Sequence, residues 1–336
     1  MDMETHLKVI TCTKFFSCAS GLFVLAALLA GPAPSVHAQS PQAVAIPVVV
    51  PSAPGSAPDI IARLLGDELR SRLGVNVVIE NRGGGGGIVA VNAARSHASP
   101  EALLLAQAAV VTTTPVTYKA AQYDLSRDME PVAVVAETPM FFVANPSKGP
   151  KSLAEALKIA RERPDSLLMT SPARGSIPHL SAELLMIATG VRFHMVPMGA
   201  SAQAIQAVVN GDSLISVDGI SPLLPLVRSG RLTAIGVAAS RVLPGFEGLP
   251  LVRDTVPDFE ATGWFMLFAK KGASASRLGE LNAAVNAALA SPELQSRMQA
   301  SAAYAVGGSV EQAREFLSRE KARWAEAVQR AGIQPE

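Results

Sequence analysis

Three stretches of the chain place small and polar residues directly after an apolar, strand-like run and directly before a helix start. They cover residues 48–59, 167–176 and 193–201. The first N–H groups of a helix have no acceptor inside the helix, and together with the helix dipole they attract anions. In an open α/β sheet such turns lie at the carboxyl ends of strands, where ligands bind. Three of them in one chain predict a cleft that holds a small anion, such as a carboxylate.

The first of these turns has the most complete pattern. Three valines at residues 48–50 predict a buried strand, and a turn without bulky side chains follows. Ser56 is a good N-cap, Asp59 can complete a capping box, and Pro58 falls in the first helical turn, where its missing N–H costs little. The helix then has an apolar face at Ile61, Leu65, Leu69 and Leu73. Taken alone, this pattern is equally typical of an ordinary strand–turn–helix link.

The second turn carries a charge and lies next to a histidine. Arg174 lies inside this turn, and a guanidinium there could bind a carboxylate through two hydrogen bonds, or could be a solvated surface group. His179, in the first turn of the next helix, could contact a ligand or only hold the loop. Asp218 follows a later strand and precedes Gly219. It could accept a hydrogen bond from a ligand hydroxyl or amine, or cap a helix.

Other motifs with known chemistry are incomplete. The five glycines at residues 83–87 are not followed by Lys-Ser/Thr, and Ile88 and Val89 stand where G-x-G-x-x-G needs its last glycine. We expect this run to let the backbone pass close to a neighbour or a ligand. The histidines beyond the leader lack metal-site spacing, and there is no G-x-S-x-G elbow. A hydrolase could use Ser176 with His179, although no third, orienting group is visible.

The first 38 residues differ from the rest and are predicted to be a secretory signal peptide. Two lysines precede an apolar run, and V-H-A at residues 36–38 suits cleavage. A membrane anchor is the alternative, but the run is short and contains polar residues. Cys12 and Cys18 both lie in this leader, so the mature chain should have no disulfide or thiolate site. With 336 residues and a net charge of +1, we expect one or two soluble α/β domains in the periplasm and no nucleic-acid partner.

Strand-like runs alternate with helical patterns along the mature chain, as in βαβ units with a largely parallel sheet. Two separate strands are predicted at residues 131–137 and 140–144, and residues 244–259 should be irregular. Gly230 is placed to end a helix, and Ser309 with Gln312 forms a capping box for the last helix. Further strands are expected at residues 75–80, 103–108, 167–170, 191–196, 214–217, 232–238 and 264–269, and helices at 88–95, 152–163, 177–189, 201–209, 220–229, 274–290 and 292–302.

Six motifs occur in an order that resembles the Bug family, the TctC-like substrate-binding proteins of tripartite tricarboxylate transporters. They are V-P-S-A-P-G-S-A-P-D, V-I-E-N-R-G-G-G-G-G, Y-D-L-S-R-D-M-E-P-V, G-S-I-P-H-L-S-A-E-L, V-P-M-G-A-S and T-G-W-F-M-L-F-A. The likeness runs from residue 46 to residue 333. Each motif alone is modest, but their shared order and spacing are specific to the family.

The resemblance implies an α/β fold of the two-lobed, type II-like periplasmic binding protein class. Each lobe would be a mostly parallel sheet flanked by helices, with the ligand cleft between the lobes. Lobe one would hold residues 40–140 and 263–336, and lobe two residues 141–262. Family members bind small carboxylates, often through the first and second turns. Carried onto this chain, the ligand-binding residues would be Ser52, Ala53, Gly55, Ser56, Asp59, Gln107, Ser171, Arg174, Gly175, Ser176, His179 and Asp218.

This chain departs from the family pattern in the turns themselves. Ser52 and the pair G-S at residues 55–56 stand where the first turn usually has an aromatic residue and two glycines. Arg174 replaces an asparagine or small residue in the second turn, and M-G at residues 198–199 replaces a Tyr-Lys pair in the third. The ligand of other members therefore does not carry over. Arg174 favours a second carboxylate or a more acidic ligand.

These features predict a solute-binding protein that captures a small carboxylate-bearing ligand, without catalysis, metal or cofactor. It would close by rotation of the lobes and deliver the ligand to the permease subunits of a tripartite tricarboxylate-type transporter, or to a sensor domain. We expect it to act as a monomer. One alternative is a ligand-independent accessory or sensory partner protein, because the turns are altered. The other is an exported hydrolase built on Ser176 and His179.

Overall fold

The computed structural model describes residues 45–335, which belong to one compact unit. The predicted signal peptide, with Cys12 and Cys18, lies outside these residues. Because the described residues cluster as a single unit, the division into lobes of residues 40–140 plus 263–336 and 141–262 stays a prediction. No helix within residues 45–335 combines the length and the apolar character needed to cross a bilayer.

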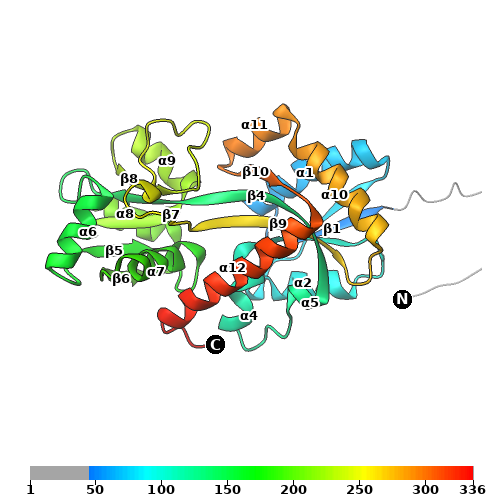
Figure 1. Ribbon diagram of the computed structural model, residues 1–336, viewed down its shortest axis with the longest axis horizontal. Helices are drawn as coiled ribbons and strands as arrows, with labels where there is room; N and C mark the ends of the chain where they lie inside the picture. The colour runs from blue at the N-terminus through cyan, green and yellow to red at the C-terminus, as the bar shows by residue number, and fades with distance from the viewer. Residues whose placement is uncertain (1–44, 336) are drawn as a thin grey trace, which may run out of the picture. The chain divides into compact units, whose positions relative to one another are not determined.

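Ten strands of the described chain join in one hydrogen-bonded network (Figure 1). The strand order is β2-β1-β3-β9-β4-β7-β5-β6, and β8 and β10 pair with β4 beside this path. The strands are β1 Ile46–Val50, β2 Val77–Asn81, β3 Leu103–Gln107, β4 Met129–Ala144, β5 Leu168–Ser171, β6 His194–Pro197, β7 Ile215–Gly219, β8 Thr233–Ala238, β9 Thr262–Lys270 and β10 Tyr304–Gly307.

The predicted α/β class is confirmed, and the parallel pairs lie where strands alternate with helices. β1 pairs in parallel with β2 and β3, and β5 pairs in parallel with β6 and β7. Every antiparallel pair among these strands includes β4 or β9. The two long strands therefore connect two groups of parallel strands.

Strand β4 is one continuous strand of 16 residues, so the prediction of two strands at 131–137 and 140–144 is wrong. Its first part, up to Pro139, pairs with β9, and its second part, from Met140, pairs with β7 and β8. Proline cannot donate to a strand ladder and usually interrupts a central strand. Pro139 is tolerated because it lies where β4 changes partners, so the missing N–H falls at a junction between two ladders.

The predicted helices are present, and the short elements between them are the ones that the sequence pattern misses. These are α3, α4, α5 and β10, none longer than five residues, which is too short for a period to show. The helices are α1 Ala57–Leu73, α2 Ile88–Ser96, α3 Ala108–Thr112, α4 Thr114–Thr117, α5 Leu125–Asp128, α6 Leu153–Glu162, α7 Ile177–Thr189, α8 Ser201–Asn210, α9 Ile220–Arg228, α10 Ala275–Leu289, α11 Pro292–Ala300 and α12 Val310–Arg330, with the 3₁₀ turns η1 Gly85–Gly87 and η2 Val252–Asp254.

A buried carboxylate joins the last helix to the sheet. Trp264 in β9 and Trp324 in α12 both donate their indole N–H to Oε2 of Glu320, at 2.8 and 2.9 Å. Glu320 is 2% exposed, and Arg323 pairs with its other oxygen at 3.2 Å. Because a buried charge is costly without partners, these contacts fix how α12 sits against β9. The capping box of Ser309 and Gln312 at the start of α12 is confirmed.

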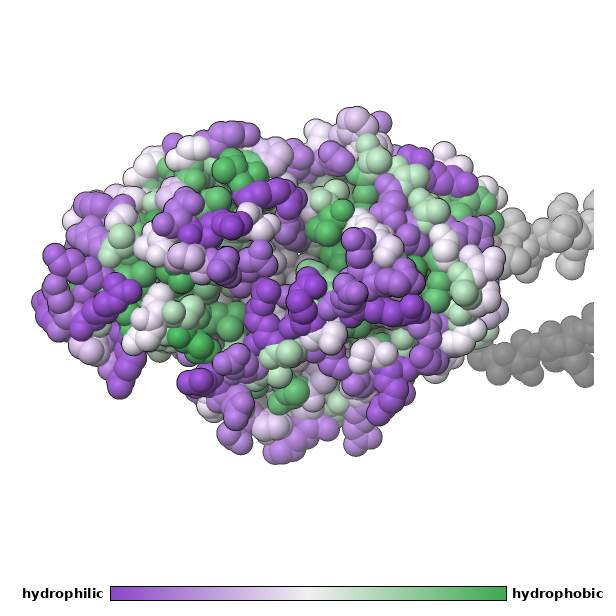
Figure 2. All heavy atoms as spheres, in the orientation of Figure 1, coloured by the Kyte–Doolittle hydropathy of each residue, from purple (hydrophilic) through white to green (hydrophobic). Residues whose placement is uncertain are grey.

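The surface gives little sign of a large apolar interface. On the face shown in Figure 2, polar residues dominate and hydrophobic residues form separate patches. The large apolar side chains that remain exposed are scattered over several elements, at Ile60, Val78, Val89, Val116, Tyr118, Val242 and Val306. Isolated exposed apolar residues are ordinary on globular proteins.

Candidate functional site

The first turn, between β1 and α1, is held by Asp59 rather than by the predicted capping box. The hydroxyl of Ser56 donates to the Ala53 carbonyl at 2.7 Å and makes no cap to the helix. Asp59 Oδ2 accepts the Gly55 N–H at 2.8 Å, and Asn81 donates to Oδ1 at 2.9 Å. Asp59 therefore ties the turn to the end of β2. Its oxygens are occupied by the protein itself, which corrects the predicted capping box, whereas its predicted role in ligand binding stays a prediction.

The charge of Asp59 is stabilised where it lies. Burial acts to raise the pKa of this carboxyl, but hydrogen bonds from Arg63, Gly55 and Asn81 outweigh burial and lower it. Asp59 is only 2% exposed and forms an ion pair with Arg63 at 3.0 Å. A carboxylate with so many donors stays ionised at neutral pH and keeps the turn in one conformation.

The glycine run lets the backbone approach its neighbours closely, as expected. A Cβ on Gly87, where φ is 99°, would lie 2.6 Å from a methyl group of Val110. Thr114 in α4 donates its hydroxyl to the Gly86 carbonyl at 2.9 Å. The glycines therefore bring bare backbone to the edge of a cavity, and α3 and α4 hold it there.

The second turn, between β5 and α7, satisfies most of its own polar groups. The Gly175 N–H donates to Nδ1 of His179 at 3.2 Å. The hydroxyl of Ser176 accepts the backbone N–H of His179 at 3.4 Å and so caps α7. Since the imidazole faces Gly175 and not the serine hydroxyl, Ser176 and His179 form no nucleophile–base pair, and the hydrolase alternative is wrong.

His179 is held neutral by its surroundings. The residue is 4% exposed, and burial, helped by the positive charge of Arg174, lowers its pKa from 6.5 to about 4. Its Nε2 lies 3.6 Å from a carboxylate oxygen of Glu183, whose pKa is itself raised by burial. Because Nδ1 accepts from Gly175, the proton of the neutral ring is on Nε2. His179 therefore stabilises the second turn through its hydrogen bond with Gly175.

Asp218 lies at the end of β7 and does not cap the helix that follows. It is 5% exposed, and its Oδ1 accepts the Gly219 N–H at 2.7 Å. Gly219, not Asp218, is the N-cap of α9. Within residues 45–335, Oδ2 of Asp218 is buried without a hydrogen-bond partner, and burial raises the pKa of the group. Ser171, at the end of β5, is fully buried, and its hydroxyl reaches only the Pro172 carbonyl.

A cavity of about 1070 Å³ brings the first and second turns together, whereas the third turn is not part of its lining. The glycine run, the start of α3, α4 and the C-terminal residues 332–335 complete its wall. Six of the predicted ligand-binding residues line it, namely Ser52, Ala53, Gln107, Arg174, Gly175 and Ser176. The other six are outside the lining and support the turns or lie elsewhere, namely Gly55, Ser56, Asp59, Ser171, His179 and Asp218.

The lining of this cavity includes two polar side chains with unpartnered atoms and one cation. Oγ of Ser52 and Oε1 of Gln107 are buried and have no hydrogen-bond partner within residues 45–335. Arg174 is the single charged side chain among the described residues of the lining. Buried polar atoms without partners are uncommon in native proteins and call for an absent partner such as water or a ligand. Because Arg174 adds a positive charge to these polar groups, the cavity is suited to a polar, anionic molecule.

Several residues of the cavity wall are absent from the predicted set of ligand-binding residues. Thr113, Thr114, Thr117 and Tyr118 line the cavity from the segment after β3. Each of these threonines donates its hydroxyl proton to a backbone carbonyl, so toward the cavity it offers lone pairs. The run T-T-T-P soon after the end of β3 could have indicated these residues, because ligands of α/β proteins bind at the carboxyl ends of the strands.

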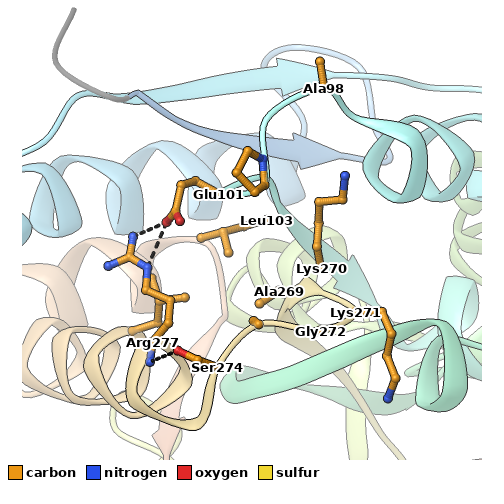
Figure 3. A pocket seen from close by; sticks show the side chains of 12 residues that line it. Ala98, Glu101, Leu103, Ala269, Lys270, Lys271, Gly272, Ser274 and Arg277 are labelled. Carbon is orange, nitrogen blue, oxygen red and sulfur yellow. Dashed lines mark hydrogen bonds and ion pairs between the residues drawn. The ribbon is translucent and has the colours of Figure 1, made fainter. Parts of the chain in front are cut away.

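A second hollow, of about 480 Å³, lies where β3 begins and β9 ends (Figure 3). Its cations are already used by the protein. Arg277 points toward Glu101, with Nε 2.8 Å from the carboxylate, and Lys270 donates to the His97 carbonyl at 2.6 Å. Lys271 pairs with Glu130 at 2.7 Å. An anionic ligand would have to displace these contacts, so the larger cavity is the better candidate.

Comparison with known proteins identifies the family of the chain. Residues 61–333 match the profile of the tripartite tricarboxylate transporter family receptor. The protein BugT of Bordetella pertussis is 30% identical over 315 residues, which cover 93% of this chain and 96% of the relative. The predicted resemblance to the Bug family is confirmed.

Solved structures show the same fold. Rpa4515 of R. palustris, solved with adipate, has a TM-score of 0.70 at 28% identity, and the match covers 87% of this chain and 98% of that one. MatC of Rhodopseudomonas palustris, with bound malate, has a TM-score of 0.64 at 28% identity, covering 85% and 99%. The periplasmic binding protein BugD has a TM-score of 0.67 at 26% identity, covering 87% and 99%. The predicted periplasmic-binding-protein fold is confirmed.

Proposed function

The chain belongs to the tripartite tricarboxylate transporter receptor family, and we propose that it captures a small organic dianion in the large cavity. The family is one of substrate-binding receptors and not of enzymes. One observation carries the proposal: the lining of the cavity combines Ser52 and Gln107, each with a polar atom that has no hydrogen-bond partner among the described residues, with the cation of Arg174. Polar groups from different turns suit a ligand with a carboxylate at each end.

The chemistry of each group fits this role. The Ser52 hydroxyl can donate to one carboxylate, and the Gln107 amide can turn its NH₂ toward the same group. Arg174 supplies a charge-assisted hydrogen bond, which is about twice as strong as a neutral one. The hydroxyls of Thr113, between α3 and α4, and of Thr117 in α4 accept rather than donate toward the cavity, so they suit a hydroxyl or amine between the two ends of a ligand.

The ligands of related structures support a dianion. Rpa4515 is described with adipate and MatC with malate, and each of these molecules has two carboxylates. Both proteins are 28% identical to this chain. The turns differ from the family pattern, so the proposal extends to the class of ligand and not to adipate or malate itself.

Delivery and location are part of the same proposal. We propose that the protein is exported by its predicted signal peptide at residues 1–38, acts in the periplasm as a monomer, and hands its ligand to the permease subunits of a tripartite tricarboxylate-type transporter or to a sensor domain. The description of the family as a transporter receptor supports this proposal. Ligand uptake is expected to close the two proposed lobes on each other, the hinge motion of periplasmic binders.

Thermal unfolding with a ligand panel tests the proposed function. The panel holds succinate, malate and adipate, the monocarboxylates butyrate and hexanoate, citrate, and neutral amino acids. A dicarboxylate at about 100 times its dissociation constant should stabilise the protein by about 2.7 kcal/mol. Ser52→Ala should weaken binding about tenfold, because it removes one donor to the ligand. No stabilisation by any anion would overturn the proposal and favour the ligand-independent accessory role.

A further inference from the structure

The end of the chain forms part of the cavity wall. Residues 332–335 line it beside the second turn, and Figure 1 shows the end of α12 reaching α7 and α4. Helix α12 ends in a Schellman motif: the Ile333 N–H donates to the Val328 carbonyl at 3.3 Å, and the Gly332 N–H donates to the Gln329 carbonyl at 3.1 Å. Gly332 has the positive φ of 60° that this motif needs. The wall therefore has a defined backbone conformation.

The second turn contacts the C-terminal end of α12 through hydrogen bonds from Arg174. Nη2 of Arg174 donates to the carbonyl oxygens of both Ala331 and Gly332, each at 3.3 Å. These are carbonyls that the helix itself leaves without a partner, and the negative end of the helix dipole attracts a cation there. A Cβ on Gly175 would lie 3.7 Å from Ile333, so the neighbouring backbone also meets the end of the chain.

The contact uses only one edge of the guanidinium. Both hydrogen bonds come from Nη2, and a guanidinium has five N–H donors in a fixed plane. Anchoring one nitrogen fixes the plane of the group and leaves the other donors for a carboxylate. A side chain that is already oriented loses less entropy when it binds. Arg174 is otherwise exposed and would sample many rotamers.

We propose that the C-terminal end of α12 is a positioning element of the ligand site: it orients Arg174 and thereby sets the preference for a ligand with a second carboxylate. This inference rests on the proposed function, because it assigns the second carboxylate of the same ligand to Arg174. It makes residues 331 and 332 determinants of specificity through their backbone, without requiring that they contact the ligand.

Two glycine substitutions separate positioning from general stability. Gly332 and Gly74 both follow a helix with a positive φ, of 60° and 66°, and a Cβ on either meets nothing within 4 Å. Valine at either position strains the backbone in the same way. Gly332→Val should disturb the carbonyls that hold Arg174, whereas Gly74→Val, at the end of α1, is the matched control.

Calorimetric titration of the full mature chain with adipate, hexanoate, succinate and butyrate measures the preference. Wild type should bind each dicarboxylate at least tenfold more tightly than the monocarboxylate of equal length. Arg174→Gln should lower dicarboxylate affinity about tenfold or more and monocarboxylate affinity less than threefold. Gly332→Val should reduce the preference several-fold, Gly74→Val should leave it unchanged, and the double variant Arg174→Gln/Gly332→Val should lose no more than Arg174→Gln alone.

The outcomes distinguish the two proposals. An unchanged preference in Gly332→Val, additive losses in the double variant, or equal binding of mono- and dicarboxylates by wild type overturns the positioning role while carboxylate binding stands. Absence of binding by wild type to every carboxylate overturns the proposed function, and the positioning role falls with it. If Gly332→Val is unfolded at 25 °C, Gly332→Ala replaces it, because alanine is less strained than valine at a positive φ. Gly74→Ala is then the control.

Discussion

At the scale of single residues, the second turn depends on a histidine that stays neutral well below the usual histidine pKa. His179 accepts the Gly175 N–H through Nδ1, and it can do so only while that nitrogen is unprotonated. Protonation would place a charge in a buried site next to Arg174, although Glu183 lies 3.6 Å from Nε2. The conformation of the second turn, which lines the candidate cavity, is thus coupled to the protonation of His179.

This coupling predicts a pH-dependent loss of stability. The pKa of His179 falls from 6.5 in the unfolded chain to about 4 in the folded protein, so between these values the unfolded state binds the additional proton. Stability is unaffected by this group above pH 6.5 and declines as the pH falls toward 4, by about 3 kcal/mol in all. His179→Asn keeps an acceptor for Gly175 but does not titrate in this range.

Urea unfolding of wild type and His179→Asn at several pH values between about 7.5 and 4 measures the effect. The free energy of unfolding of wild type should fall by about 3 kcal/mol more than that of the variant over this range. The carboxylates away from His179 titrate alike in both proteins and cancel in the difference, and Glu183→Gln in both backgrounds removes the one carboxylate that lies beside His179. Parallel curves for the two proteins would show that His179 does not change its pKa on folding.

At the scale of elements, the sequence predicts the long, periodic segments and misses the places where tertiary context decides. Helix α7 falls at residues 177–189 as predicted, because its apolar spacing and its Ser176 cap agree. Strand β4 is predicted in two pieces, and Pro139, which lies between them, would normally interrupt a strand. The strand continues because its pairing partners change at Met140. This change depends on tertiary contacts and cannot be recognised in the local sequence.

In the candidate site, too, local patterns are predictable from the sequence and long-range contacts are not. The turns after β1 and β5 are readable as ligand turns because strand–turn–helix links have a local signature. The pattern does not show which turns share a cavity, and the third turn and Asp218 prove to lie outside the large one. Nor does it show that the chain end joins the site, because Gly332 and Arg174 meet from positions 158 residues apart.

The packing of β9 on β4 gives a prediction at this scale. Gly263 in β9 pairs with Thr138 in β4, and a Cβ on Gly263 would lie 2.6 Å from the Thr138 hydroxyl oxygen. Gly263→Ala should therefore destabilise the protein by about 1–3 kcal/mol through overpacking. In a Thr138→Ala background most of this loss should disappear, because the clashing oxygen is gone.

Denaturant unfolding of the two single variants and the double variant measures the coupling between these positions. Gly279→Ala is the matched control: Gly279 is exposed in α10, a Cβ there would meet nothing within 4 Å, and the substitution should stabilise by about 0.5–1 kcal/mol. Equal effects of Gly263→Ala with and without Thr138 would mean that the contact between β4 and β9 is not the cause.

At the scale of the whole described chain, the arrangement of β4 supports the proposed two-lobed division. Its first part pairs with β9 and β10, and its second part pairs with β7 and β8, so β4 together with β9 connects the two groups of parallel strands. The candidate cavity draws Ser52 from the turn after β1, Gln107 from the end of β3 and Arg174 from the turn after β5. A ligand bound at both ends would therefore connect the two groups.

Such a connection predicts closure that can be measured as a distance. Residues 45–335 contain no cysteine, so introduced cysteines can be labelled alone. Ser71→Cys in α1 and Arg161→Cys in α6 replace exposed residues in the two proposed lobes. With saturating adipate, or whichever dicarboxylate stabilises the protein most, the distance between spin labels at these positions should shorten by several Å, because the ligand binds the closed state more tightly.

Two comparisons decide whether a shorter distance reports this closure. The pair Ser71→Cys and Ser96→Cys, both within proposed lobe one, should keep its distance when the ligand binds. Arg174→Gln should weaken the ligand's hold on the second group of strands, so the closing transition should shift to higher ligand concentration. An unchanged distance between Ser71→Cys and Arg161→Cys, under conditions where the ligand demonstrably stabilises the protein, would mean that binding occurs without movement of the two groups of strands.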